Sequence, residues 1–450
     1  MAVSITAAVQ RIKAEVGHWL TPEAIRELCR SVGHRWRERE LDPVTTIHLF
    51  LLQILAGNTA CAHVPRLGDV NCTGEAYGQA RSRLPLAVFR GLLARICERL
   101  PVSSDEGRWH GHRTFLVDGS SLSMPDTPAL QREYGQPRGQ APGCGFPVLH
   151  LLAMFQAATG FLIAVATAPY RTHDMSRVGR MHPDLKEGDI LVGDRAFCSF
   201  VHLTLLSARA AFGLFRIHQR QIVDFRPRRR AAARGSRKRG AKGLPTSKWL
   251  KRLGKHDHWV EYAKPRRRPE WMSAVEYASL PEKLVVRELR YTIATPGRRT
   301  RSITLATTLL DPVTYRAADL AELYGRRWEI ETNFAHMKTS LKMDVLHCKT
   351  VEGVQKELTM YALAYNLIRL VMLEAARRQE VPVERISFVD AARWLARAVD
   401  ESVPLKLRVN PHRPGRVEPR AKKRRAKQYD LLNEPRGVLR KRLLAKRKAA

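Results

Sequence analysis

The sequence predicts an α/β fold with a mixed β-sheet, preceded by a helical region and followed by a basic helical region. From about residue 113 onward, short apolar runs typical of strands alternate with helix-compatible stretches, which is the pattern of an α/β layer. Before that point, apolar residues recur at helical spacing. With 450 residues, 44% of them hydrophobic, the chain can form two or three domains with a substantial core. We expect domains at 1–108, 109–375 and 376–450.

The N-terminal region, 1–108, is predicted to be a helical DNA-binding domain. Four stretches show helical periodicity: Ile5–Val16, Ile25–Val32, Thr45–Ala56 and Leu86–Leu100. Its basic residues include Arg35, Arg37, Arg39 and Arg66, which are consistent with phosphate contact. For any single arginine, a solvated helix surface is the simpler interpretation. At the other end, 376–450 is predicted to be helical and basic, with runs at 420–427 and 440–448 and a possible role in dimerisation.

The central region is predicted to supply the sheet. Five short runs have the composition of strands: Thr114–Val117, Val148–Phe155, Phe161–Ala166, Asp189–Asp194 and Gly213–Ile217. The second and third are joined by a tight turn at 157–160, and helical stretches lie around 175–181 and 201–211. Two of the runs lead directly into an aspartate, Phe-Leu-Val-Asp118 and Ile-Leu-Val-Gly-Asp194.

Residues 220–310 are predicted to form an insertion that is part basic loop and part β-meander. The stretch 226–252 contains twelve Lys or Arg and no acidic residue, with Pro and Gly interspersed, so we expect a flexible loop that follows a DNA backbone without reading its sequence. Three later stretches alternate apolar and polar residues as half-exposed antiparallel strands do: Trp259–Ala263, Val285–Thr295 and Ser302–Leu309. The two histidines His256 and His258 are expected to be solvated.

The charge points to a polyanionic partner. Lys and Arg number 78 against 43 Asp and Glu, a formal net charge of +35 with a pI near 10.6. Cations that neutralise phosphates release condensed counterions and so gain affinity. Double-stranded DNA is the favoured partner, although basic RNA-binding proteins share this composition.

Nothing in the sequence predicts a metal-thiolate site or a membrane span. The seven cysteines are scattered and form no CxxC pair, so we expect free thiols in a reducing cytoplasm. The most apolar stretch, 148–168, contains His150, Gln156 and a turn, so it is predicted to be two buried strands rather than a membrane helix. We expect a cytoplasmic, nucleoid-associated protein without membrane contact.

Asp118 and Asp194 are candidate ligands of a divalent metal. Functional groups gather where strands end in α/β sheets, and two carboxylates brought together repel each other unless a cation lies between them. A turn or helix cap explains one such aspartate as simply, and two in one sheet argue more strongly for a site. His173-Asp174, after the third strand, is better interpreted as a helix start than as a ligand pair.

A third acidic residue is predicted on the helix around 324–338. Tyr324, Arg327, Glu331 and Lys338 are spaced by 3, 4 and 7 residues and fall within about 60° of one another on a helix surface. Glu329 lies on nearly the opposite face. An exposed Arg327–Glu331 salt bridge explains the pattern equally well.

This spacing, Tyr-(2)-Arg-(3)-Glu-(6)-Lys, resembles the motif of the insertion-sequence-4 family of DDE transposases. Two upstream segments resemble the family's aspartate motifs in the same order: Phe-Leu-Val-Asp118-Gly-Ser and Gly-Asp194-Arg-Ala-Phe. The segment Thr304–Asp311 and the approach to Arg327 are also similar. The resemblance covers most of 110–370, and it is loose over the N-terminal helices.

The resemblance implies an RNase H-like catalytic domain with a β-rich insertion between the second aspartate and the glutamate. It implies that Asp118, Asp194 and Glu331 bind two Mg²⁺ ions, with Mn²⁺ able to substitute, for in-line displacement at phosphorus. Tyr324, Arg327 and Lys338 would then hold phosphates near the transferred strand. From this resemblance we expect a cut-and-paste DNA transposase that acts at the inverted-repeat ends of its own element as a synaptic homodimer, and a hairpin route is associated with this motif.

Three alternatives stay open at this point. An RNase H-like nuclease without strand transfer would use the same site, and a catalytically inactive, DNA-binding derivative of a transposase would keep the charge. A basic RNA-binding protein explains the charge without the three ordered carboxylate motifs. Arg195, next to the second aspartate, is expected either to hold a phosphate or to pair with a carboxylate.

Overall fold

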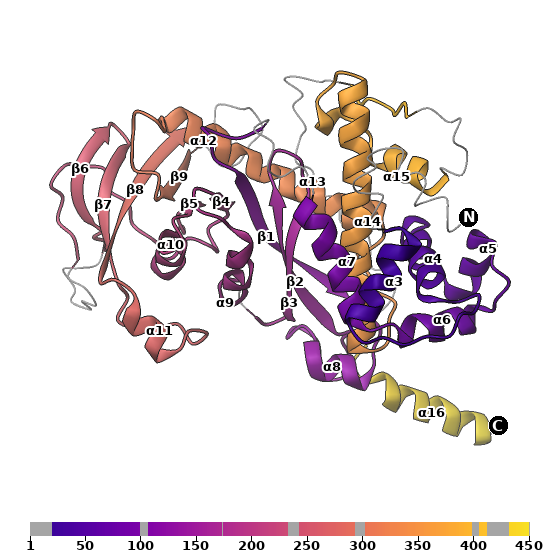
Figure 1. Ribbon diagram of the computed structural model, residues 1–450. Helices are drawn as coiled ribbons and strands as arrows, with labels where there is room; N and C mark the ends of the chain where they lie inside the picture. Colours follow the sequence, from indigo (N-terminus) through magenta and orange to yellow (C-terminus); the bar gives the residue numbers. More distant parts are fainter. Residues whose placement is uncertain are drawn as a thin grey trace.

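The computed structural model describes residues 20–99, 107–172, 174–232, 243–292, 302–397, 405–411 and 432–449. Its centre is one mixed sheet of nine strands in the order β3-β2-β1-β4-β5-β9-β8-β7-β6 (Figure 1). Helices of the N-terminal region and of the chain's last third lie beside one end of this sheet, and the insertion strands form the other end. The predicted α/β class with a mixed sheet is therefore confirmed.

The first five strands follow the predicted order of elements. β1 (Thr114–Ser123), β2 (Val148–Gln156) and β3 (Leu162–Pro169) form an antiparallel meander, and β4 (Ile190–Gly193) and β5 (Phe212–Arg216) run parallel to β1. The β2–β3 turn has Gly160 at φ +71°, a conformation that glycine adopts without steric cost. β4 is buried along its whole length, as expected of a short parallel strand covered on both faces.

Strand alternation divides the residues of β1 between two cores. Leu116 and Leu122 belong to the larger core with the N-terminal helices and α14, whereas Phe115 and Val117 belong to the smaller core on the other face. Successive side chains of a strand point to opposite faces. The face of every other β1 side chain therefore follows from its position relative to these four residues.

The insertion extends the same sheet rather than forming a separate one. β9 (Ser302–Thr307) pairs antiparallel with β5, and β8 (Lys283–Thr292), β7 (Asp257–Ala263) and β6 (Lys248–Gly254) continue outward. A short helix, α11 (Ala274–Ser279), begins with a capping box formed by Ser273 and Glu276. The predicted strands of the meander are present.

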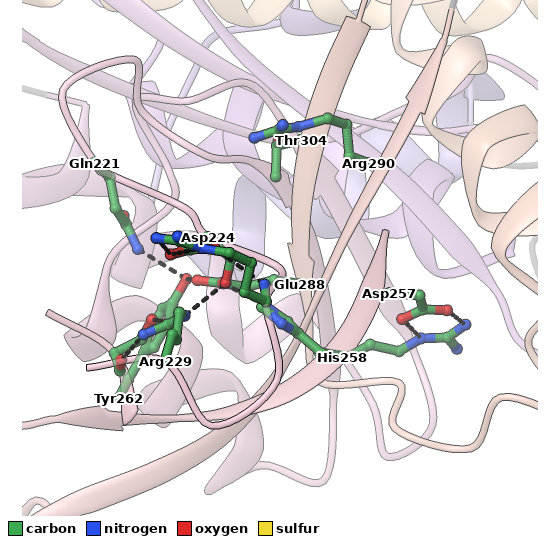
Figure 2. A network of polar contacts seen from close by, with 12 residues as sticks. Gln221, Asp224, Arg229, Asp257, His258, Tyr262, Glu288, Arg290 and Thr304 are labelled. Carbon is green, nitrogen blue, oxygen red and sulfur yellow. Dashed lines mark hydrogen bonds and ion pairs between the residues drawn. The ribbon is translucent and has the colours of Figure 1, made fainter. Parts of the chain in front are cut away.

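The prediction of a flexible loop at 226–252 is wrong for its C-terminal end, whereas residues 226–232 belong to no helix or strand. Residues 248–252 belong to β6. Residues 226–232 follow a chain segment anchored by a buried polar network, in which Gln221 donates to Tyr262, and Tyr262 and His258 both hydrogen bond to Glu288 (Figure 2). Glu288 is fully buried, and its two partners offset the cost of desolvating a carboxylate. Residues 233–242 lie outside the described part of the chain.

The expectation that His258 is solvated is also wrong. His258 is fully buried, and its Nε2 lies 2.9 Å from a Glu288 oxygen. The sequence around it is polar and basic, but β7 is an inner strand of the sheet, and both Asp257 and His258 are buried in it.

The described N-terminal region is helical, as predicted. Its helices are α3 (Pro22–Ser31), α4 (Pro43–Leu55), α5 (Val64–Gly68), α6 (Gly74–Arg83) and α7 (Leu86–Arg99). Thr21, Asp42 and Thr73 each accept a hydrogen bond from a first-turn amide of the helix that follows. The predicted helix Ile5–Val16 lies outside the described residues. Apolar side chains of α3, α4 and α7 share one continuous core with α14.

α14 (Val351–Arg378) is the longest helix described and lies in the centre of that core. It is long and apolar enough to cross a membrane by length and composition, but 83% of its most apolar window is buried inside the protein. It is followed by α15 (Phe388–Arg397), which packs on it, and by the exposed basic helix α16 (Arg436–Ala449). The remaining helices of the central region are α8 (Pro128–Tyr134), α9 (Met175–Val178) and α10 (Phe200–Ser207).

Candidate active site

Three polar side chains lie in one row across neighbouring strands. Val117 pairs with Gly193, and Gly193 pairs with Phe215, so the residues that follow them stand at one level of the sheet. Those residues are Asp118, Asp194 and Arg216. By alternation from Leu116, Val192 and Leu214, all three side chains face the larger core and the helices that cover it.

The prediction that β1 ends at Asp118 is wrong. β1 continues to Ser123, paired with β2, and only its parallel pairing with β4 stops at Val117. Asp118 therefore stands where β1 loses one of its two neighbours. Asp194, in contrast, directly follows the last residue of β4, as predicted.

Asp118 is a strongly perturbed carboxyl group. Burial raises its pKa to about 6, and the nearby Asp194 carboxylate adds to the rise, while the Gly119 amide and Arg327 oppose it. The Gly119 amide donates to Asp118 Oδ1 at 2.8 Å, and Arg327 Nη1 lies 3.5 Å from Oδ2. A carboxyl with this environment, beside a second carboxylate, is a functional-site candidate on physical grounds.

Asp194 is held by a turn of its own. Its Oδ1 accepts the Ala196 amide at 2.6 Å, and the Phe197 amide donates to its main-chain carbonyl at 3.2 Å. These bonds fix the carboxylate at the end of β4. Arg195 points to solvent, where its Nη1 donates to Gln219 at 2.7 Å, so it does not pair with a carboxylate in this structure.

The helix predicted to carry the third acid is interrupted in the structure. It consists of α12 (Ala317–Gly325), a 3₁₀ turn at Arg326–Trp328, α13 (Glu329–Ala335) and a π turn at His336–Ser340. π turns occur frequently at functional sites because they redirect side chains.

Arg327 bridges two of the candidate acids. Its Nη1 lies 3.5 Å from Asp118, and its Nη2 lies 3.6 Å from Glu331. Its Nε is buried without a hydrogen-bond partner among the described residues. Glu329, two residues before Glu331, instead pairs with Arg326 at 2.8 Å. The helical spacing therefore predicted correctly which glutamate lies beside Arg327.

Lys338 reaches the same strand from the other end of the helix. Its Nζ lies 3.3 Å from Ser120 Oγ, 3.0 Å from the Ser121 carbonyl and 3.0 Å from Asp344. Ser120 follows Asp118 on the same face of β1. Lys338 thus stands beside the candidate acids, as the motif spacing implied.

Tyr324 and Arg216 complete the surroundings. Tyr324 is buried, which raises the pKa of its phenol to about 12, while its neighbours Arg327 and Arg216 lower it and Asp194 raises it. Sequence analysis did not single out Arg216. Arg216 is identified by its place at the end of β5, the strand next to β4 and Asp194. This place can be recognised only when the strand order is known.

The donor set suits a divalent cation. Across the described ranges, no three His, Cys, Asp or Glu side chains are gathered closely enough to hold a metal ion. However, the oxygens of Asp118, Asp194 and Glu331 are the hard ligands that Mg²⁺ prefers, and Arg327 puts positive charge between two of them. Burial is the main cause of the raised pKa of Asp118, and the neighbouring Asp194 carboxylate adds negative charge that a cation would offset.

The chain belongs to the family described as transposase DDE domain, which matches residues 109–367. It is 23% identical over 372 residues to the transposase InsG for insertion sequence element IS4 of Escherichia coli (strain K12), covering 80% of this chain and 77% of that protein. It is also 29% identical over 127 residues to the putative transposase InsZ of the same strain, covering 28% of this chain and 42% of that protein.

These relatives confirm the predicted insertion-sequence-4 family and DDE type, and with them a transposase that acts on DNA. Among solved structures, the piggyBac transposase in a synaptic complex with hairpin DNA is similar at a TM-score of 0.45 and 8% identity, covering 86% of this chain and 79% of that one. A likeness this remote carries no argument about the present fold.

Proposed function

We propose that this transposase cleaves DNA at the inverted-repeat ends of its element and joins the ends to target DNA by a cut-and-paste route, with Asp118, Asp194 and Glu331 as its catalytic acids. The observation that carries the proposal is that Asp118 and Asp194 lie at one level of neighbouring strands, with Arg327 within 4 Å of both Asp118 and Glu331. The strand order β3-β2-β1-β4-β5, with β4 and β5 parallel to β1, supports an RNase H-like catalytic domain.

Asp118, Asp194 and Glu331 would hold two Mg²⁺ ions, or Mn²⁺ in their place. When bound, such ions activate the attacking oxygen and stabilise the leaving 3′-oxygen in an in-line displacement at phosphorus. Asp194 is fixed for this role by the Ala196 amide, and Asp118 by its own strand and the Gly119 amide. Glu331 is more than half exposed, and among the described residues its one close ion-pair partner is Arg327, so its carboxylate is free to reorient.

The cationic residues would hold phosphates of the strand being cut. Arg327 offers a planar fork for bidentate contact, and Lys338 offers a point charge beside Ser120. Tyr324 and Arg216 border the same space, and the exposed Arg195 extends it outward from Asp194. Releasing Arg327 from the two carboxylates would free its guanidinium for a phosphate.

The partner is double-stranded DNA at the element ends and at the target. The N-terminal helices would bind the ends, because Arg35, Arg37, Arg39 and Arg83 line one groove of about 470 Å³ together with Trp36. Two element ends must be joined to one target, so we propose that the protein acts as a homodimer.

The central experiment measures Mg²⁺-dependent cleavage and joining of DNA that carries the element's ends. Asp118→Ala, Asp194→Ala and Glu331→Ala should each lower the cleavage rate by about a hundredfold or more, because lost transition-state charge stabilisation of this kind costs about 3–4 kcal/mol. DNA binding in a gel-shift assay should be retained. Glu329→Ala is the matched control, since Glu329 pairs with Arg326 outside the site.

Each outcome assigns the protein to one class. Cleavage by any of the three alanine variants at the wild-type rate would overturn the site. Cleavage without joining by the wild-type protein would indicate a nuclease, and binding without cleavage would indicate an inactive derivative.

A further inference from the structure

A histidine and an aspartate from two separate elements meet beside the strand that carries Asp118. His150 lies on β2, directly across from Ser121 of β1, and its Nε2 contacts Asp174 Oδ1 in an ion pair. Asp174 comes from the segment between β3 and α9. Both side chains are largely buried, at 16% and 21% exposure. The proposed cleavage reaction gives this pair no role so far.

The pair lies on the opposite face of the sheet from the Asp118 side chain. His150 alternates with Leu152 and Met154, which belong to the smaller core, and Asp118 alternates with Leu116 of the larger core. The pair is therefore not placed to share a metal ion with Asp118 from the same side.

The contact between this pair and Asp118 runs through Gly119. A Cβ on Gly119 would stand 2.7 Å from Asp174 Oδ1 and 3.0 Å from the His150 ring, so the pair packs directly against the backbone there. The Gly119 amide is the group that donates to Asp118 Oδ1. Any shift of Gly119 toward the smaller core would carry that amide, and with it the carboxylate, out of place.

Among the described strands, only β2 pairs with this part of β1, and Lys338 Nζ contacts it at Ser120 Oγ and the Ser121 carbonyl. β4 pairs with β1 only as far as Val117, and from Asp118 to Ser121 the strand has β2 as its only named neighbour in the sheet. A strand segment paired on one edge is easier to displace than one paired on both. The His150–Asp174 pair packs against that segment on the face of the sheet that carries the smaller core.

Asp174 is not engaged in an ordinary helix-capping role. It occupies the position before α9, as the sequence suggested for a helix start, but its side chain accepts no hydrogen bond from the first turn of that helix. Its carboxylate is turned toward His150 and Gly119 instead. The partner predicted beside it in sequence, His173, lies outside the described residues.

We propose that His150 and Asp174 are positioning residues of the transposase, which hold the Gly119 amide and so set the Asp118 carboxylate for catalysis. This inference rests on the proposed role of Asp118. The positioning role depends on the hydrogen bond between the two side chains. It does not require the Asp174 carboxylate to bind a metal ion. Isosteric variants that keep the hydrogen bond should therefore keep activity.

The test compares cleavage kinetics of four variants in the full-length protein. Asp174→Ala and His150→Ala should lower the maximal cleavage rate by about tenfold to a hundredfold, the range seen when groups that orient metal ligands are removed. They should raise the Mg²⁺ concentration for half-maximal rate and leave the Kd for end DNA unchanged. Asp174→Asn still accepts from His150, and His150→Gln still donates at the Nε2 position, so both should recover most of the rate.

Two controls separate positioning from loss of folding. Asp319→Ala removes the carboxylate of another His–Asp pair, formed with His110 at 3.5 Å, and should leave the rate and its Mg²⁺ dependence unchanged. The thermal unfolding midpoint of each variant is measured in parallel, and a variant that binds DNA with the wild-type Kd is folded enough to interpret.

Three results would overturn the inference. Asp174→Ala with wild-type rate and Mg²⁺ dependence would show that the pair is not needed. Asp174→Asn as inactive as Asp174→Ala would show that the carboxylate itself acts, as a ligand. A rate loss with no change in Mg²⁺ dependence would indicate a general structural role. Asp118→Ala is run alongside, because activity in that variant would refute the proposed function, whereas its inactivity beside an active Asp174→Ala would refute only the positioning role.

Discussion

At the scale of single residues, Arg327 shows how the site balances charge. It neutralises two carboxylates at once, and in a low-dielectric position such a guanidinium cannot be replaced by a flexible ammonium without losing one of its two contacts. Lys keeps the charge but not the fork. The geometry of the fork, rather than its charge alone, is what we expect catalysis to require.

We therefore predict that Arg327→Lys lowers the cleavage rate by about tenfold or more, a loss typical of removing one charge-assisted contact in the transition state. Arg326→Lys is the matched control, because the adjacent Arg326 pairs with Glu329 and the Ala157 carbonyl outside the site. Single-turnover cleavage at saturating DNA measures both. Equal rates for the two variants would contradict the bridging role.

At the scale of elements, the described arginines after β5 have different roles. Arg229 donates to the Asp224 carbonyl and to Ser247, and Arg226 pairs with Asp224, so these two order the segment (Figure 2). Arg228 and Arg230 are exposed and, as far as the structure describes the chain, form no ion pair. The network around Glu288 thus presents free cations on an ordered segment.

Replacing Arg228 and Arg230 by Gln should weaken DNA binding and reduce the slope of log K against log salt by roughly 2, since each phosphate contact contributes about 0.9. Arg226→Gln is the control, because its guanidinium is already paired with Asp224. Binding titrations at several salt concentrations provide the slopes. An unchanged slope in the double variant would exclude this segment as a phosphate contact.

Two buried histidines couple α10 to the preceding 3₁₀ helix (Gly179–Asp184). His202 Nδ1 donates to the Phe197 carbonyl at 2.8 Å, which leaves its Nε2 to accept from His182 Nε2 at 3.1 Å. Burial lowers the pKa of His202 to about 3 and that of His182 to about 4, against an ordinary value of 6.5. Both side chains are therefore neutral in the folded protein.

This pair should make the protein sensitive to acid. Below pH 6.5 the unfolded chain binds protons that the folded protein does not. The free energy of unfolding therefore decreases as the pH is lowered, by about 2 kcal/mol between pH 6.5 and 5 for one histidine. Denaturant unfolding at several pH values measures this. A His182→Gln, His202→Gln double variant should lose most of that slope, and exposed His63→Gln should not. A slope shared by all three proteins would refute the assignment.

At the scale of the whole molecule, the N-terminal helices and the catalytic region share one core. Glu357 on α14 is fully buried and accepts from Asn58 of the N-terminal region at 2.6 Å and from the His347 and Cys348 amides. Apolar residues of α3, α4 and α7 fill the space around α14. A region that buries its core against another does not unfold independently of it.

We predict one cooperative unfolding transition that includes the N-terminal helices. Asn58→Ala should lower the free energy of unfolding by about 1–3 kcal/mol, because a buried carboxylate oxygen loses a donor. Calorimetry together with a probe on α3 measures both statements. An earlier, separate transition of the N-terminal helices would contradict the shared core.

Much of this architecture was predictable from the sequence, because helix and strand periodicity are local properties. The strands of the meander and the adjacency of Arg327 and Glu331 both follow from spacing along the chain. The full length of β1 was missed because Gly119 and the serines after Asp118 interrupt its apolar pattern. His258 was misjudged because the polar sequence around it gives no sign that the buried Glu288 of β8 lies beside it.

The sequence by itself determined the fold class, the three acidic candidates and the family. Tertiary structure alone decided that Asp118, Asp194 and Arg216 stand at one level of the sheet, because strand order and register join residues far apart in the chain. It also decided that His150 and Asp174 meet against Gly119. Periodicity along the chain predicts the face of an element on which a side chain lies. Its contacts depend on how the elements pack in three dimensions.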